Sequence, residues 1–217
     1  GADSQGGMGY MIQQMLGNEL RALGVDRCVV SVVTQTAVDP DDPAFGNPSK
    51  PIGPFYTADV ADAKVREQGW RVVEDANRGW RRVVPSPMPK RIVEADAISA
   101  LLESGCVVIG AGGGGIPVVD DAGELRGVEA VIDKDHASRL LANQIGASLL
   151  IMSTDVESVS LFYCTDRQRE LAAMNVTEAA EYYDQGHFPP GSMGPKVLAS
   201  IAFIKNGGEE VIITNPD

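Results

Sequence analysis

The sequence predicts an α/β fold, a three-layer αβα sandwich in which helices flank a mainly parallel sheet. Residues 7–23 carry apolar side chains at helical spacing, and Gly24 stands where a helix would be capped. The next run, 27–34, is apolar almost throughout, which is typical of a buried strand. We expect a single domain over 1–217, with a protruding subdomain inserted at 37–85, where prolines interrupt the alternation.

The alternation of helix and strand patterns continues to the end of the chain. A hairpin is expected where a turn-forming Asp-Asp-Ala-Gly sequence separates two short extended pieces. The expected helices are 93–104, 135–146, 177–185 and 195–205, the strands 106–111, 148–154 and 210–214, and the hairpin 116–131.

Composition excludes several classes of function. The 217 residues carry a net charge of −12, which argues against a nucleic-acid partner because phosphate backbones are bound by clustered Lys and Arg. No apolar run approaches the length of a membrane span and no signal peptide is visible, so we expect a cytoplasmic protein without membrane contact. Cys28, Cys106 and Cys164 are isolated in the sequence, and we expect them to be reduced core residues. Two histidines and no cysteine cluster argue against a zinc site.

The inserted segment holds one candidate functional lysine. Residues 47–56 contain three prolines and a short helix is expected at 59–69. Lys50 is either a solvated loop lysine or a cation that the stiff proline frame holds in place for a ligand. The arginine cluster at 78–82 is interpreted as a salt-bridged ribbon.

Four consecutive glycines, Gly112, Gly113, Gly114 and Gly115, follow the strand expected at 106–111. Glycines at a strand end can bring bare backbone N–H groups close to a ligand, and such donors suit a phosphate. The alternative is a flexible hairpin or linker.

Two lysines beside expected helix starts are candidates for contact with an anion. Lys134 lies between two aspartates, and Asp135 can cap the helix expected to begin there. Lys196 follows Pro195 in the first turn of another expected helix, where a cation is poorly placed unless an anion is bound. At the end of the strand expected at 148–154, Thr154 and Asp155 lie at the sheet edge that collects ligands, although Asp155 can equally form a turn.

Five motifs together resemble those of carbamate kinases, which belong to the amino-acid kinase family. The resemblance covers essentially the whole chain and the motifs occur in the order of that family. They are 47–56 (NPSKPIGPFY), 78–87 (RGWRRVVPSP), 112–118 (GGGGIPV), 127–135 (GVEAVIDKD) and 191–196 (GSMGPK).

The resemblance implies a reversible reaction in which carbamoyl phosphate and ADP give ATP and carbamate, which is released as ammonia and carbon dioxide. It also implies Mg²⁺ with the nucleotide, a cytoplasmic homodimer and a place in arginine and carbamoyl phosphate catabolism. Positioning and charge neutralisation are most of the catalysis in phosphoryl transfer, which agrees with a site built from lysines.

The resemblance also implies roles for individual residues. Lys134 matches a lysine that contacts the transferred phosphoryl group, Asp135 an aspartate that organises lysines and metal, and Lys196 a phosphate-binding lysine on the nucleotide side. Lys50 matches a lysine of the mobile subdomain that closes over the site. Gly112–Gly115 match a loop at the phosphate and carbamoyl end, and the matches at the nucleotide are Thr154, Asp155, Ser192, Met193 and Gly194.

The chain departs from the family pattern at its start. Carbamate kinases begin with a strand and a Gly-Gly-Asn loop that cradles the phosphoryl group, and we expect the domain to be incomplete at the N-terminus. Residues 158–164, where the family shapes its adenine pocket, are also less typical. Two alternatives therefore remain: an inactive truncated paralogue that binds nucleotide or dimerises, and a sister kinase acting on another small carboxylate.

Overall fold

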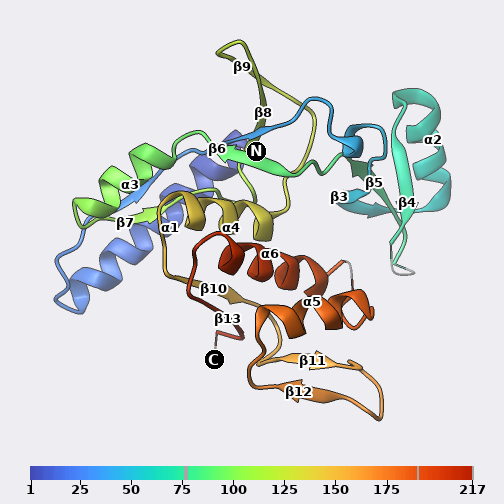
Figure 1. Cartoon of the computed structure of the whole chain (residues 1–217). Helices are drawn as coiled ribbons and strands as arrows, with labels where there is room; N and C mark the ends of the chain where they lie inside the picture. The colour runs from blue at the N-terminus through green and yellow to red at the C-terminus, as the bar shows by residue number, and fades with distance from the viewer. Residues whose placement is uncertain (76–77, 190, 217) are drawn as a thin grey trace.

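The computed structural model describes residues 1–75, 78–189 and 191–216. It confirms an α/β fold, with parallel and antiparallel strand pairs and, in the described part of the chain, six α-helices (Figure 1). The predicted helices and strands occur in the predicted order, but they are divided among several small sheets. The structure adds strands that the apolar patterns did not predict, among them Gln35–Val38, Pro89–Ile92, Val159–Leu161 and Arg169–Leu171.

The first layer is formed by one long helix and two short parallel strands. Helix α1 (Ala2–Ala22) packs on β1 (Val29–Ser31), which pairs in parallel with β7 (Val107–Ile109). Helix α3 (Ala95–Glu103) leads into β7. Gly9 lies in contact with Ser31, and a Cβ at this position would overlap the serine side chain. A glycine is therefore required where α1 approaches the strand.

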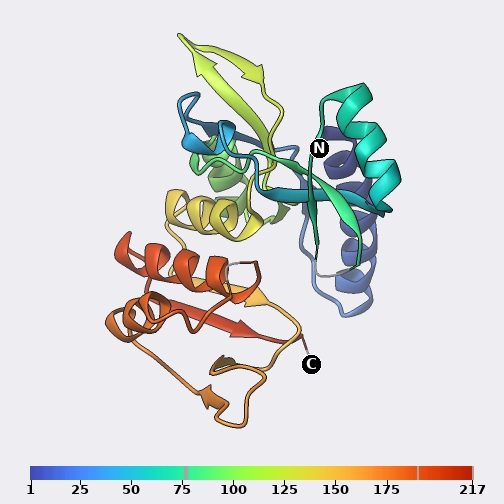
Figure 2. The same cartoon turned by 90° about the vertical axis from the view of Figure 1, so that its right-hand side faces the viewer.

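A four-stranded mixed sheet lies beside this layer. Its order is β6 (Pro89–Ile92), β2 (Gln35–Val38), β8 (Ile116–Asp121) and β9 (Glu124–Gly127). Strands β2 and β8 are parallel, and β8 and β9 form the predicted hairpin, which extends away from the body of the molecule (Figure 2). The sequence analysis expected the strand at 27–34 to be the last one before the inserted segment. The structure shows a further strand, β2, at the junction between that strand and the segment.

The C-terminal part packs around a second parallel pair. Strand β10 (Leu149–Ser153) pairs with β13 (Glu210–Thr214), and β11 (Val159–Leu161) pairs with β12 (Arg169–Leu171). Helices α5 (Val176–Asp184) and α6 (Met193–Lys205) cover these strands, and α4 (Lys134–Gln144) lies against α6 (Figure 2). An apolar core holds the unit together: Val159, Leu161, Ala179, Phe188, Val197 and Ile201.

Residues of the inserted segment form a small unit of their own, to the right in Figure 1. A short 3-10 helix (Pro43–Phe45) leads to the antiparallel sheet β3 (Lys50–Tyr56), β5 (Trp80–Val84) and β4 (Arg71–Glu74), and α2 (Ala58–Gln68) packs on it. The arginines pair as predicted, Arg81 with Asp75 and Arg82 with Glu129.

Two expectations about burial are wrong. The apolar residues of α1 do not face the core, because Gly9 is its one fully buried residue and Met15 is 61% exposed. The cysteines are not core residues either, since Cys28 and Cys164 are exposed and Cys106 is half-buried. In both cases, the apolar residues within or beside the segment led us to expect burial that the structure does not show.

Candidate active site

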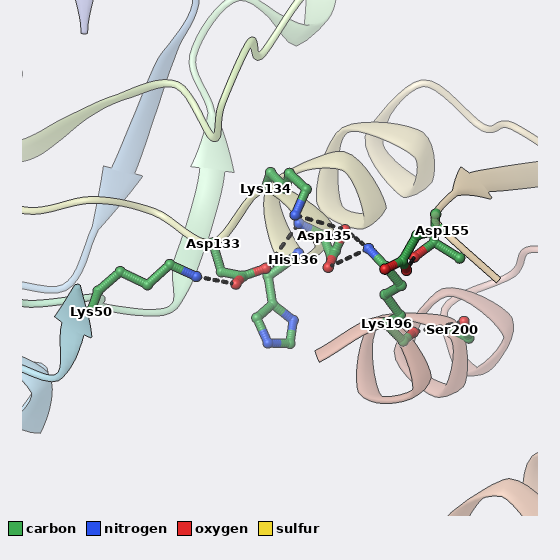
Figure 3. A network of polar contacts seen from close by, with 9 residues as sticks. Lys50, Asp133, Lys134, Asp135, His136, Asp155, Lys196 and Ser200 are labelled. Atoms are coloured by element: carbon green, nitrogen blue, oxygen red, sulfur yellow. Dashed lines mark hydrogen bonds and ion pairs between the residues drawn. The ribbon is translucent and has the colours of Figure 1, made fainter. Parts of the chain in front are cut away.

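The centre of the site is a buried ion pair between the first turns of α4 and α6. The Lys196 ammonium donates to both carboxylate oxygens of Asp135, each at 3.1 Å (Figure 3). Lys196 is 7% exposed and Asp135 is 8% exposed. Charges are buried at such low exposure only when they are paired, so each residue fixes the other.

This pair explains how a cation is tolerated at the start of α6. Lys196 lies in the first turn of that helix, as predicted, but the helix begins two residues earlier than expected, so that Pro195 and Lys196 are its third and fourth residues. The sequence suggested that a bound anion must compensate its charge. In the structure, the carboxylate of Asp135 supplies that negative charge from the neighbouring helix.

Lys134 has a different environment, although it is adjacent in sequence to Asp135. Its ammonium lies 3.9 Å from Asp135 Oδ1, and its side chain is 63% exposed. The contact is long (Figure 3), and Lys134 is one of the residues that line a hollow beside the pair. Lys134 is therefore available to an incoming anion, whereas Lys196 is already held.

Asp133 is a site residue that the sequence analysis missed. It caps α4 by accepting a hydrogen bond from the Asp135 N–H at 2.9 Å, so the cap is two residues earlier than predicted. Its other oxygen accepts from Lys50 Nζ at 2.7 Å. Burial alone would raise the pKa of Asp133, but the hydrogen bond and charge of Lys50 outweigh burial and lower it.

The Lys50–Asp133 ion pair joins the inserted unit to the main body. Lys50 is the first residue of β3, and Asp133 begins α4 (Figure 3). The proline-framed lysine is therefore positioned toward the site, rather than pointing freely into solvent as the alternative interpretation required.

His136 follows directly and was also missed. Its Nδ1 atom is buried and has no hydrogen-bond partner among the residues that the structure describes. Burial lowers the pKa of this imidazole, although the nearby carboxylates of Asp133 and Asp135 oppose the shift. The neutral form is therefore favoured in the fold.

Most of the predicted site residues surround one hollow of about 320 Å³. Thr154 donates to Asp155 Oδ1 at 3.1 Å on one wall of it. The predicted residues in its lining are Lys50, Lys134, Asp135, Thr154, Asp155, Ser192, Met193 and Lys196. Gly194 is not in the lining: a Cβ there would lie 2.8 Å from the Pro189 carbonyl oxygen, so this glycine permits close backbone packing.

The glycine loop lies in an adjoining hollow of about 790 Å³. Gly112, Gly113 and Gly115 line it together with Val131 and Ile132, which lead directly to Asp133 and Lys134. The loop is therefore connected to the lysine cluster through residues 131–133, but it does not line the same hollow.

Two buried threonines hold the glycine loop in place. The Thr36 hydroxyl donates to the Gly114 carbonyl at 2.8 Å, and the Thr34 hydroxyl accepts from the Ala111 N–H at 2.9 Å. Both threonines are fully buried. The sequence could have indicated this role, because both threonines lie in or beside an apolar run and a buried hydroxyl group needs a hydrogen-bond partner.

The acidic residues of the site fit a magnesium ion that arrives with a nucleotide. No group of three or more His, Cys, Asp or Glu residues is placed to hold a metal alone within 1–75, 78–189 and 191–216. Mg²⁺ uses one or two carboxylates together with substrate phosphates and water. Asp135 and Asp155 both open on the lysine-lined hollow, which meets that requirement.

Comparison with known proteins gives the class of this protein. The profile described as "Amino acid kinase family" matches residues 11–215. The chain belongs to the amino acid kinase family.

Within that family, the similar proteins are carbamate kinases. The chain is 56% identical to the carbamate kinase of Pyrococcus horikoshii over 99% of its own length and 68% of that protein. It is 52% identical to a carbamate kinase-like protein of Escherichia coli, over 100% of the chain and 69% of the relative. The solved carbamate kinase of Giardia lamblia bound to AMP-PNP superposes with a TM-score of 0.89 at 44% identity, covering 99% of this chain and 68% of that one.

None of the helices in the described ranges combines the length and apolar character needed to cross a membrane.

Proposed function

We propose that this chain is a carbamate kinase, which transfers a phosphoryl group reversibly between carbamoyl phosphate and ADP. The products are ATP and carbamate, which decomposes to ammonia and carbon dioxide. The observation that carries the proposal is the convergence of Lys50, Lys134 and Lys196 on one hollow around Asp133 and Asp135. Relatives named carbamate kinase at more than half identity support this choice of substrate.

Lys134 is the group we assign to the transferred phosphoryl group. Its ammonium is exposed to the hollow and is not committed to a short ion pair. In phosphoryl transfer, negative charge spreads over the equatorial oxygens, and a preorganised cation stabilises it. Carbamate is already an anion, so no residue is needed to remove a proton from it.

Lys196 and Asp135 are assigned to the nucleotide side. The ion pair holds the Lys196 ammonium in one position at the start of α6, beside Ser192 and Met193 of the same hollow. A phosphate bound there gains the fixed charge of the lysine at the amino-terminal end of α6, where the helix dipole also favours an anion. When bound, Mg²⁺ supplies further neutralisation of the nucleotide phosphates.

The inserted segment 37–85 is assigned to closure of the site. Lys50 reaches Asp133 from β3, so the small unit contacts the start of α4 through an ion pair that is partly open to solvent. A phosphoryl group in the hollow would offer Lys50 a second anionic partner, and the unit would then close over it.

A homodimer is part of the proposal. Helix α1 is 21 residues long and exposes an unusual number of large apolar side chains: Met8, Tyr10, Met11, Ile12 and Met15. Met8, Met11, Ile12 and Met15 follow the spacing of one helix face, and an exposed apolar face is typical of a protein–protein interface. Light scattering should give twice the chain mass for the wild type and the single mass for Met15→Glu, while Met88→Glu, at an exposed methionine elsewhere, should leave the dimer intact.

A substrate panel tests the assignment of the reaction. ATP formation from ADP and Mg²⁺ should be faster with carbamoyl phosphate than with acetyl phosphate, and phosphorylation of acetylglutamate by ATP should be negligible. Faster turnover with acetyl phosphate or acetylglutamate would show a sister kinase. No turnover with any of the three substrates would favour the inactive truncated paralogue. The same resemblance supports a cytoplasmic enzyme that acts in the breakdown of arginine.

A further inference from the structure

We propose that Cys28 and Cys106 form an oxidisable dithiol, a modification site at the amino ends of β1 and β7. Oxidation joins the two sulfur atoms in a disulfide that links these parallel strands. The site lies outside the lysine-lined hollow, and the proposal does not depend on the reaction assigned above.

The strand register makes the two cysteines direct neighbours. Val29 pairs with Val107 in the parallel ladder, so the preceding residues, Cys28 and Cys106, stand side by side. The Val107 N–H donates to the Cys28 carbonyl at 2.8 Å. One residue earlier, the Arg27 guanidinium donates to the Gly105 carbonyl at 3.2 Å, so the chains are held together on both sides of the pair.

This arrangement meets the geometric requirement for a disulfide. Neighbouring strands lie about 4.8 Å apart, and disulfides join residues whose Cα atoms are about 4.4–6.8 Å apart. Residues at equivalent positions in a parallel pair also project to the same face. The hydrogen bond and charge of Cys106 raise the pKa of the Cys28 thiol, which agrees with the neighbouring positions that the strand register gives the two residues.

The pair is accessible to a reagent in solution. Cys28 is exposed and Cys106 is half-buried. The Cys106 sulfur also lies 3.4 Å from the Ser104 hydroxyl, a polar neighbour rather than an apolar one. A cysteine buried among apolar side chains would be inert, whereas an exposed pair can react with a small disulfide.

The chemistry balances with a disulfide oxidant such as oxidised glutathione. One protein thiolate attacks the oxidant and releases one molecule of glutathione, leaving a mixed disulfide. The second protein thiolate attacks the protein sulfur of that bond and releases the other glutathione. Two protein thiols are oxidised to one disulfide, and one oxidant molecule is reduced to two thiols.

The position of the link suggests its effect. The carboxyl end of β1 leads to Thr34, and that of β7 leads to Ala111 and the glycine loop, whereas the cysteines lie at the opposite ends of the strands. The disulfide would therefore tie together the two strands that support this loop without entering either hollow. It closes a long loop in the chain, so we expect the oxidised form to be more heat-stable.

The test is intact-mass spectrometry after treatment with excess oxidised glutathione and alkylation of the remaining thiols. The chain has three cysteines, so three alkyl groups are expected on the reduced protein and 3 − 2 = 1 on the oxidised protein. We expect a mass loss of about 2 Da, corrected for the alkyl groups, a Cys28–Cys106 peptide in the digest, and a rise in Tm of about 5 °C or more.

Three serine variants make the result specific. Cys164→Ser should respond as the wild type does, and Cys28→Ser and Cys106→Ser should show neither the mass loss nor the rise in Tm. Unchanged Tm values under reducing conditions would establish that each variant is folded. Three alkylated thiols in the treated wild type, or a disulfide that involves Cys164 or two chains, would overturn the proposal.

Discussion

Lys196 on α6 donates to both carboxylate oxygens of Asp135 on α4, and neither side chain is more than 10% exposed. The pair therefore joins two helices and fixes a cation at the wall of the hollow. Removal of either residue of this buried pair should therefore destabilise the fold, in addition to any effect on the reaction that we propose.

Lys196→Ala should lose both activity and stability. Removing one partner of a buried pair leaves an uncompensated charge and costs about 3–5 kcal/mol. Sequence reasoning alone predicts a variant whose fold is intact, and the burial of the pair replaces that prediction. The measurement is Tm together with ATP formation.

The double variant Lys196→Met/Asp135→Leu is the matched control. It should recover part of the lost Tm, because an apolar pair of similar size replaces the unpaired carboxylate, but it should remain inactive. A double variant less stable than Lys196→Ala would show that the pair is not the source of the loss.

Lys50→Ala should raise KM and lower kcat together, because the ion pair that ties the inserted unit to α4 is lost. The Lys50 side chain is 37% exposed, so little change in Tm is expected. Steady-state kinetics in the direction of ATP formation measure both constants.

Asp133→Asn separates the two tasks of Asp133. Asparagine caps a helix as well as aspartate does, so α4 should keep its stability while Lys50 loses its charged partner.

If Lys50→Ala changed neither kinetic constant, Lys50 would be a solvated surface lysine without a role in closure of the site.

The buried imidazole of His136 should make the protein less stable in mild acid. Its pKa in the fold lies below the usual value of 6.5, so the unfolded chain binds more protons in the interval between the two values. Stability contributed by the neutral form is therefore present above about pH 6.5 and is lost as the pH falls toward the folded pKa.

Melting temperatures between pH 8 and pH 5 should fall less steeply in His136→Gln than in the wild type. The range ends at about pH 5 because Asp133, whose pKa is lowered, contributes stability that is lost only in stronger acid, below its ordinary value. Parallel slopes for the two proteins would show that His136 does not carry the effect.

Gly114→Ala should be strongly destabilising, whereas Gly113→Ala should be tolerated. Gly114 has a φ of 131°, and a Cβ there would collide with the backbone carbonyl of Ile132, which cannot move aside as a side chain would. A Cβ on Gly113 meets nothing within 4 Å. Thermal unfolding of the two variants compares them directly, and equal Tm values would contradict this packing.

Most of the elements, the three site lysines and Asp135 could be predicted from sequence, but Asp133 and the pairing of the lysines with the aspartates could not. Strand β13 begins and ends at the predicted residues, 210 and 214, because an apolar β-branched run has clear limits. Lys50 and Lys196 could be singled out because prolines frame them. Their partners, Asp133 and Asp135, lie 83 and 61 residues away, and only the fold brings them together.

The remaining failures have a common physical cause. The sequence pattern records that a residue is apolar or flanked by apolar residues, but not which surface it meets. Met15 on α1 and Cys28 before β1 therefore appear to be core residues, although both are exposed. The neighbour relation of Cys28 and Cys106 follows from the strand register, which the sequence does not contain.

The most direct test of the proposed reaction is ATP formation from ADP, Mg²⁺ and carbamoyl phosphate by this 217-residue chain and its Lys134→Ala variant. Lys90→Ala, at an exposed lysine of β6, is the control for loss of a surface charge. We predict turnover by the wild type and by Lys90→Ala, and a loss of about 10²–10³-fold in Lys134→Ala at unchanged Tm. Equal turnover in all three proteins would contradict the assignment of Lys134 to the transferred phosphoryl group, and no ATP from the folded wild type would contradict the proposed reaction.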